Sequence, residues 1–271
     1  MRRNASVGST GASSGVSSAT MHPSLPRGSV GGGGQDAGMT FAELHESDLF
    51  VMPNAFDAGS AKRLEEAGFP ALATTSHGHA ATLGKSDLEV TRDELVAHVA
   101  LLTSVITVPL NIDSADCFPR EEGGVARTVE LLAQAGASGL SIEDYDPTRS
   151  AIVPFDEAVE RVATVVRTAH QHGIVVTARC ESVLYGLGED HLARLAAYRD
   201  AGADVLFAPL VNDEDGIAAI VALGRPVNVL AAGDHPTVER LRELGVRRVS
   251  TGGALAGIAY DAAVAAAKAL A

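Results

Sequence analysis

Several residue types are scarce in this chain, and each scarcity excludes one class of protein to which the chain could belong. Only two cysteines, Cys117 and Cys180, occur among 271 residues, so a disulfide framework is excluded and a reducing, cytoplasmic compartment is expected. No segment approaches the roughly 18 consecutive apolar residues of a membrane span. Lys and Arg number 21 against 34 Asp and Glu, and so acidic a chain lacks the basic stripe of a nucleic-acid groove. We therefore expect a globular protein that binds neither nucleic acid nor a membrane.

The first 38 residues differ in composition from the rest. They hold nine Gly and eight Ser and too few large apolar residues to build a core, so they cannot offset the entropy of ordering, and a disordered tail is predicted. Arg2 and Arg3 are not followed by an apolar run, which favours a flexible extension over an export signal. The tail carries three Arg and one Asp, which leaves −15 on residues 39–271 against −13 for the whole chain. Any anionic substrate must then be attracted locally, by a metal or a few arginines.

Residues 39–271 repeat a helical pattern that ends near a glycine and is followed by a short apolar run. In one helical segment, for example, Val125, Val129 and Leu132 recur at helical spacing. The eight predicted strands are 49–53, 71–75, 109–112, 139–142, 174–178, 205–208, 227–230 and 248–250. Eight strand-plus-helix units of this size predict a single α/β domain over 39–271, a (β/α)8 TIM-type barrel.

A doubly wound open sheet is the alternative fold. It would more often have about five to seven strands and a glycine-rich first turn. Neither the dinucleotide motif G-x-G-x-x-G nor the phosphate-binding motif G-x-x-x-x-G-K-[ST] is present in the chain. The barrel is therefore the preferred prediction.

Acids and an arginine follow three of the predicted strands, where the active site of a barrel lies. Asp113 follows 109–112, Glu143 follows 139–142, and Arg179 follows 174–178. Carboxylate oxygens suit Mg²⁺ or Mn²⁺, and the planar guanidinium of Arg179 suits a carboxylate or phosphoryl group. These residues predict a metal-dependent site at the carboxyl edge of the sheet.

Other interpretations of the strand-end residues stay open. The turn Ser76-His77-Gly78 offers backbone N–H groups for an oxyanion. An acid at a strand end is often only a helix N-cap, which applies to Asp57 as well as to Asp113 and Asp144. Other residues have simpler explanations: Arg179 as a partner of Glu181 or Glu143, and His77 and His79 in structural roles.

Several short motifs, taken together, resemble the isocitrate lyase/phosphoenolpyruvate mutase superfamily. They span roughly residues 45 to 268 and comprise Asn54–Ala61, Ala67–Phe69, Asn111–Asp113, Ser141–Asp144, Thr177–Arg179 and Ala201–Asp204. The resemblance implies a (β/α)8 barrel, Mg²⁺, and cleavage of a C–C or P–C bond in a small 2-oxo acid or its equivalent. It also implies an enolate-like intermediate and a homo-oligomer, a dimer or tetramer, that exchanges its last helix, here Tyr260 to Ala271.

The resemblance also implies roles for individual residues. Asp113 would hold the metal directly, and Glu143 and Asp87 would hold it directly or through water. Arg179 would bind the substrate carboxylate, and the backbone from Ser76 to Gly78, His77 included, would bind the oxo or enolate oxygen. The candidates for the proton donor are Tyr145, His77 and the neighbourhood of Arg149.

Two positions depart from the family pattern. Where the family usually has a second acid after the first, this chain has Ala115, so either Asp116 substitutes through a shifted loop or water takes that place. The segment 145–154 lacks the Cys of isocitrate and methylisocitrate lyases and the Lys and Asn of the phosphonate mutases. Isocitrate lyase itself is therefore not expected.

The prediction is a Mg²⁺-dependent lyase or hydrolase that cleaves a C–C bond of a small 2-oxo or 2-hydroxy di-acid and releases pyruvate, oxalate or a similar fragment. Two alternatives remain: P–C chemistry of the phosphoenolpyruvate mutase or phosphonopyruvate hydrolase kind, and a barrel that binds a small acid without catalysis.

Overall fold

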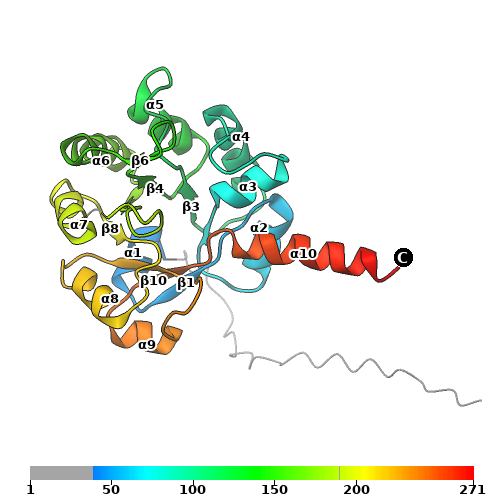
Figure 1. The fold of residues 1–271 in the computed structure, drawn as a ribbon. Coiled ribbons are helices and arrows are strands. Elements are labelled where there is room, and N and C mark those ends of the chain that lie inside the picture. Colours follow the sequence, from blue (N-terminus) through cyan, green and yellow to red (C-terminus); the bar gives the residue numbers. More distant parts are fainter. Residues whose placement is uncertain (1–38, 189) are drawn as a thin grey trace, which may run out of the picture. The chain divides into compact units, whose positions relative to one another are not determined.

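The computed structural model describes residues 39–188 and 190–271, and Figure 1 shows their arrangement. The predicted tail, residues 1–38, lies outside this range. Eight parallel strands follow one another in the order β1-β10-β9-β8-β7-β4-β3-β2. A parallel bridge between Asn54 and Ala73 joins the two ends of this sheet, with the Ala55 amide donating to the Ala73 carbonyl at 2.7 Å. The sheet therefore closes into the predicted barrel, and the open-sheet alternative is wrong.

The predicted strands are all present, with ends that agree within two residues. They are β1 (Phe50–Met52), β2 (Leu72–Ala73), β3 (Leu110–Asp113), β4 (Gly139–Glu143), β7 (Val175–Arg179), β8 (Val205–Phe207), β9 (Val227–Leu230) and β10 (Arg248–Ser250). A short antiparallel hairpin of β5 (Tyr145–Asp146) and β6 (Ala151–Ile152), which the sequence did not predict, follows β4.

Ten helices are described, of which α2 to α9 connect the strands around the outside of the barrel, whereas α1 precedes β1 and α10 follows β10 (Figure 1). They are α1 (Phe41–Glu46), α2 (Ala58–Glu66), α3 (Ser76–Thr82), α4 (Arg92–Thr103), α5 (Gly124–Gln134), α6 (Phe155–His170), α7 (His191–Asp200), α8 (Glu214–Val221), α9 (Val238–Glu243) and α10 (Ala254–Lys268). In the described part of the chain, no helix is long and apolar enough to cross a membrane.

The main core lies between the strands and these helices. On α5, Val129 and Leu132 are fully buried against it, as their helical spacing predicts.

Two sequence-based expectations about single residues can be compared with the structure. Asp57 is a helix cap, since its carboxylate accepts from the Ser60 amide at 2.6 Å. Cys117 and Cys180 are free and buried, and burial raises the pKa of each thiol to about 12. Both cysteines therefore serve as small apolar side chains.

A second apolar cluster closes the amino-terminal end of the barrel. Phe41 and Leu44 of α1 pack against the strand residues Phe50, Val175 and Val205. The last three are the first residues of β1, β7 and β8, so α1 covers the end of the barrel where the strands begin. The opposite, carboxyl end is left for the polar residues predicted to form the site.

Two buried histidines stack between α3 and α4. The rings of His79 and His98 lie 3.7 Å apart between centroids, at an angle of 19°. Burial, and then the adjacent His79, lower the pKa of His98 to about 3; burial also lowers the pKa of His79. Both rings are therefore neutral parts of the helix packing, the structural role expected for His79.

This pair makes the stability depend on pH. In the unfolded chain a histidine takes up a proton below a pKa of roughly 6.5, whereas His98 in the folded chain does so only near 3. We expect the free energy of unfolding to be highest above pH 6.5 and to fall, by on the order of a few kcal/mol, as the pH drops toward 4.

The variant His98→Phe keeps the stacked ring and removes the titration. Thermal melts between pH 7 and pH 4 should therefore show a smaller loss of Tm in His98→Phe than in the wild type. An equal loss of Tm between pH 7 and pH 4 in the two proteins would contradict this explanation.

Candidate active site

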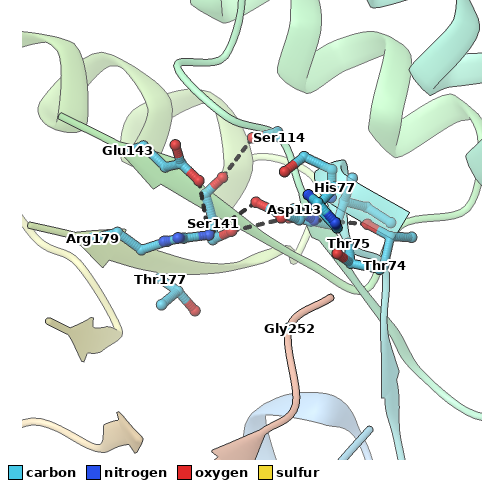
Figure 2. Close-up of polar contacts among 12 residues, drawn as sticks. Thr74, Thr75, His77, Asp113, Ser114, Ser141, Glu143, Thr177, Arg179 and Gly252 are labelled. Atoms are coloured by element: carbon cyan, nitrogen blue, oxygen red, sulfur yellow. Dashed lines mark hydrogen bonds and ion pairs between the residues drawn. The ribbon is translucent and has the colours of Figure 1, made fainter. Parts of the chain in front are cut away.

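Side chains from three neighbouring strands meet at the carboxyl end of the barrel, as Figure 2 shows. Asp113 and Glu143 end β3 and β4, and Glu143 lies beside Arg179 in the sheet register. Arg179 Nη1 donates to Asp113 Oδ1 at 3.0 Å and to Glu143 Oε1 at 2.8 Å. Its Nε donates to Glu181 Oε1, also at 2.8 Å. The structure thus brings together the two acids and the arginine that the sequence singled out, and both proposed partners of Arg179 are real.

The cluster contains more negative than positive charge. Glu143 and Glu181 are buried, and three carboxylates share one guanidinium. Burial raises the pKa of Glu143 well above its ordinary range, and the charges of Glu181, Asp113 and Asp87 add to this rise while Arg179 opposes it. Burial likewise raises the pKa of Glu181. Two negative charges stay unbalanced when all three acids are ionised, which is the charge of one divalent cation.

The predicted metal set is only partly assembled. Asp113 and Glu143 face one common point, the position of Arg179 Nη1. Asp87 is exposed and lies 3.9 Å from His77 Nδ1, and its charge is one of those that raise the pKa of Glu143. Within residues 39–188 and 190–271, no three His, Cys, Asp or Glu side chains are grouped as a metal site. The donor chemistry and the excess charge nevertheless fit Mg²⁺, with Asp113 and Glu143 as its carboxylate ligands and water in the remaining positions.

The residues after β3 occupy the place of the family's second acid. Ala115 adopts a left-handed conformation with φ of 48°, and its carbonyl accepts from the Glu143 amide at 2.9 Å. Asp116 Oδ2 binds Arg120 Nη2 at 2.6 Å. The carboxylate of Asp116 is thus already paired with an arginine, which favours water over Asp116 in the missing ligand's place.

Ser76, His77 and Gly78 form the first turn of α3 and not the isolated turn that we expected. Thr75 is the N-cap and accepts from the Gly78 amide at 3.2 Å. The Ser76 amide donates to Asp113 Oδ2 at 2.9 Å and so orients this acid. Among the described residues, only the His77 amide of these three has no acceptor. Gly78 is required for packing, because an added Cβ would lie 2.9 Å from the Phe56 side chain.

Tyr145 belongs to an aromatic pair that sequence reasoning missed. Its ring stacks on that of Tyr185 at 3.8 Å and 8°. Burial, and then the charge of Glu143, raise the pKa of the Tyr185 hydroxyl, which places Tyr185 beside the acid cluster. Its position in the segment after β7, the strand that carries Arg179, was the available signal.

The segment after β4 is fixed by one carboxylate. Asp146 accepts from the Thr148 amide at 2.9 Å, from Arg149 Nε at 2.6 Å and from Arg120 Nη1 at 3.3 Å. Asp144 is no helix cap: its carboxylate accepts from Tyr198 Oη at 2.6 Å. Arg149, near which we expected a proton donor, is thus bound to the hairpin's own acid.

A cavity of about 380 Å³ opens beside Asp113, within the usual size range of a small-molecule site. Its polar lining residues include Ser76, Asp113 and Asp116, and its apolar ones Leu88, Val90, Leu95 and Phe118. The space suits a small organic acid held between charged and apolar walls.

A parallel barrel with acids and an arginine at its strand ends defines an enzyme that acts on small acids. The profile of the phosphoenolpyruvate phosphomutase family matches residues 41–271, and the chain belongs to the isocitrate lyase/phosphoenolpyruvate mutase superfamily.

Individual relatives agree with this assignment. An uncharacterized protein of Mycobacterium tuberculosis is 34% identical over 220 residues, which cover 79% of this chain and 82% of the relative. Oxaloacetate decarboxylase of Paraburkholderia xenovorans is 35% identical over 186 residues, covering 65% and 62% of the two chains. The crystal structure of a 2,3-dimethylmalate lyase superposes with a TM-score of 0.76 at 29% identity and covers 84% of this chain and 85% of its own. The chain is therefore a lyase of this superfamily, and the alternative of a barrel without catalysis is not supported.

Position 115 offers a test of the metal site. Aspartate tolerates the left-handed backbone better than most residues, so Ala115→Asp should fold and add a carboxylate near Asp113. We expect the affinity for Mg²⁺, measured by calorimetry, to rise about tenfold. The control Ala115→Asn has the same shape without the charge and should give a smaller gain. Equal affinities for the wild type and Ala115→Asp would exclude a cation at this position.

Proposed function

We propose that the protein is a Mg²⁺- or Mn²⁺-dependent lyase or hydrolase that cleaves a C–C bond of a small 2-oxo or 2-hydroxy di-acid through an enolate-like intermediate. The observation that supports it most directly is the convergence of Asp113, Glu143 and Arg179, of which Asp113 also lines a cavity of about 380 Å³. The substrate names of the two enzymes cited above, oxaloacetate and 2,3-dimethylmalate, are those of small di-acids, which agrees with the proposal.

Each residue of the site has a proposed role. Asp113 and Glu143 would hold the cation, which would supply stabilisation of negative charge on the substrate oxygen. Arg179 binds a substrate carboxylate: its Nη1 and Nε are used by the three acids, whereas Nη2 has no partner among the described residues. The guanidinium also stacks over Phe207 at 5.0 Å from the ring centroid, which fixes its plane. Tyr145 is the candidate proton donor.

Turnover of a panel of malate-type di-acids tests the proposal. The purified protein is incubated with each acid and Mg²⁺, and release of a 2-oxo acid is followed by a coupled assay. We expect release from at least one acid, its loss with a chelator, and its recovery with excess Mg²⁺. Asp113→Ala should lower kcat/KM by a factor of about 100 or more, because it removes the direct metal ligand.

The family profile gives a second candidate, P–C chemistry of the phosphomutase or phosphonopyruvate hydrolase kind. Phosphorus NMR of the same protein with phosphonopyruvate and Mg²⁺ decides between the two. A changed phosphorus spectrum without any release from the di-acids would replace the first proposal by the second.

We also propose that the chain forms a homo-oligomer through α10. Figure 1 shows this helix extending away from the barrel. Ile258 and Val264 on it are 64% and 52% exposed, although apolar side chains of this size are normally buried. A second copy of the chain would cover them.

Light scattering after gel filtration tests the role of α10. Ile258→Asp combined with Val264→Asp should lower the measured mass to that of one chain while circular dichroism stays unchanged. A wild type that is already monomeric would contradict the proposal.

A further inference from the structure

Arg248 is an arginine buried inside the barrel. It is the first residue of β10 and only 1% exposed. Its Nε donates to Asn228 Oδ1 at 2.8 Å and its Nη2 to Thr177 Oγ1 at 2.9 Å. Its Nη1 lies 3.1 Å from His45 Nε2. A guanidinium carries five N–H groups, so one hydrogen on Nη1 and one on Nη2 remain available.

All three partners of Arg248 are uncharged. His45 Nδ1 lies 2.7 Å from the Phe41 carbonyl, which only accepts, so the ring hydrogen is on Nδ1 and Nε2 accepts from Arg248. Burial, and then the charge of Arg248, lower the pKa of His45 to about 3, so this ring is neutral. Arg248 therefore keeps its charge deep in the barrel without an acid partner in residues 39–188 and 190–271.

The other buried arginines are paired with acids. Arg92 lies 3.5 Å from Glu121, and Arg194 lies 3.4 Å from Asp144. Burial lowers the pKa of Arg248 to about 9, which reflects the cost of a cation in this position. An apolar side chain of similar length would fill the space without that cost. Folding alone does not explain Arg248, and residues that break a folding rule are expected at functional sites.

A small polar cavity connects Arg248 with the active site. It has a volume of about 50 Å³ and is lined, among others, by Arg248, Asn228, Ser250, Arg179 and Asp113. A water molecule needs on the order of 10–15 Å³ when volume is measured in this way, so the space takes a group of three or four heavy atoms. A carboxylate has this size, and the two remaining N–H groups of Arg248 match its two oxygens.

We propose that Arg248 binds one carboxylate of a dicarboxylate substrate, while the rest of the molecule lies beside Asp113 and Arg179. The inference rests on the proposed function, since it locates the second acid group of the di-acid. The carboxylate supplies the counter-charge that Arg248 lacks. Arg248 would then select dicarboxylates over monocarboxylates, because a monocarboxylate would leave either Arg248 without a counter-charge or Nη2 of Arg179 without an acceptor.

Binding of unreactive acids tests this without any need for turnover. Succinate and butyrate have the same four carbons and differ only in the second carboxylate. Calorimetry should show that succinate binds the wild-type protein, in the presence of Mg²⁺, at least tenfold more tightly than butyrate. In Arg248→Met this preference should disappear, with succinate affinity reduced at least tenfold and butyrate affinity nearly unchanged. Arg248→Lys keeps the positive charge but loses the paired N–H groups of the guanidinium. Its succinate affinity should lie between those of the wild type and Arg248→Met.

The melting temperature distinguishes binding from a structural role. If Arg248 is kept for the substrate, Arg248→Met has an equal or higher Tm than the wild type. Two outcomes would overturn the inference: Arg248→Met that melts several degrees lower, or a succinate preference that survives in a folded Arg248→Met. A wild type that shows no preference for succinate would overturn it as well. The proposed function is judged separately, by release of 2-oxo acids.

Discussion

Arg179 connects the carboxyl ends of three neighbouring strands. Its guanidinium contacts Asp113 at the end of β3, Glu143 at the end of β4 and Glu181 just beyond β7. Loss of Arg179 would leave the buried carboxylates without their cation, and removal of one partner from a buried ion pair typically costs about 3–5 kcal/mol. The cluster is therefore both the centre of the proposed chemistry and a constraint on where these strands end. The surrounding contacts, such as the Ser76 amide on Asp113, fix the orientation of its members.

The barrel interior has two parts with opposite character. At the amino-terminal end, α1 closes the barrel with an apolar cluster that includes Phe41 and Phe50. The second part is polar: Asn228 and Thr177 accept hydrogen bonds from Arg248, which begins β10 and also contacts His45 of α1. A polar interior contributes less to stability than an apolar one. The large apolar core between the strands and helices compensates for this loss of stability. The polar part lines the small cavity that extends from Arg248 to Asp113.

The segment after β4 distinguishes this chain from the family members whose catalytic loop it lacks. Here a short hairpin is fixed through Asp146, which binds Arg120 and Arg149, and Tyr145 stacks on Tyr185 at its base. The hairpin thus places aromatic rings, and no cysteine or lysine, beside the acids. Substrate preference in this protein is therefore expected to differ from that of isocitrate lyase.

The sequence by itself determined the barrel and the acid–arginine set. The eight apolar runs are local signals, and parallel strands bring all their carboxyl ends to one face, so Asp113, Glu143 and Arg179 had to meet once the strands were recognised. What only the tertiary structure decided were partners far apart in sequence. The pairing of Arg120 with Asp146, the use of the Ser76 amide by Asp113 and the stacking of Tyr185 on Tyr145 depend on loop conformations that no periodicity encodes. Arg248 was part of a predicted strand, but its isolation from every acid in the described chain follows only from how β7, β9 and α1 enclose it.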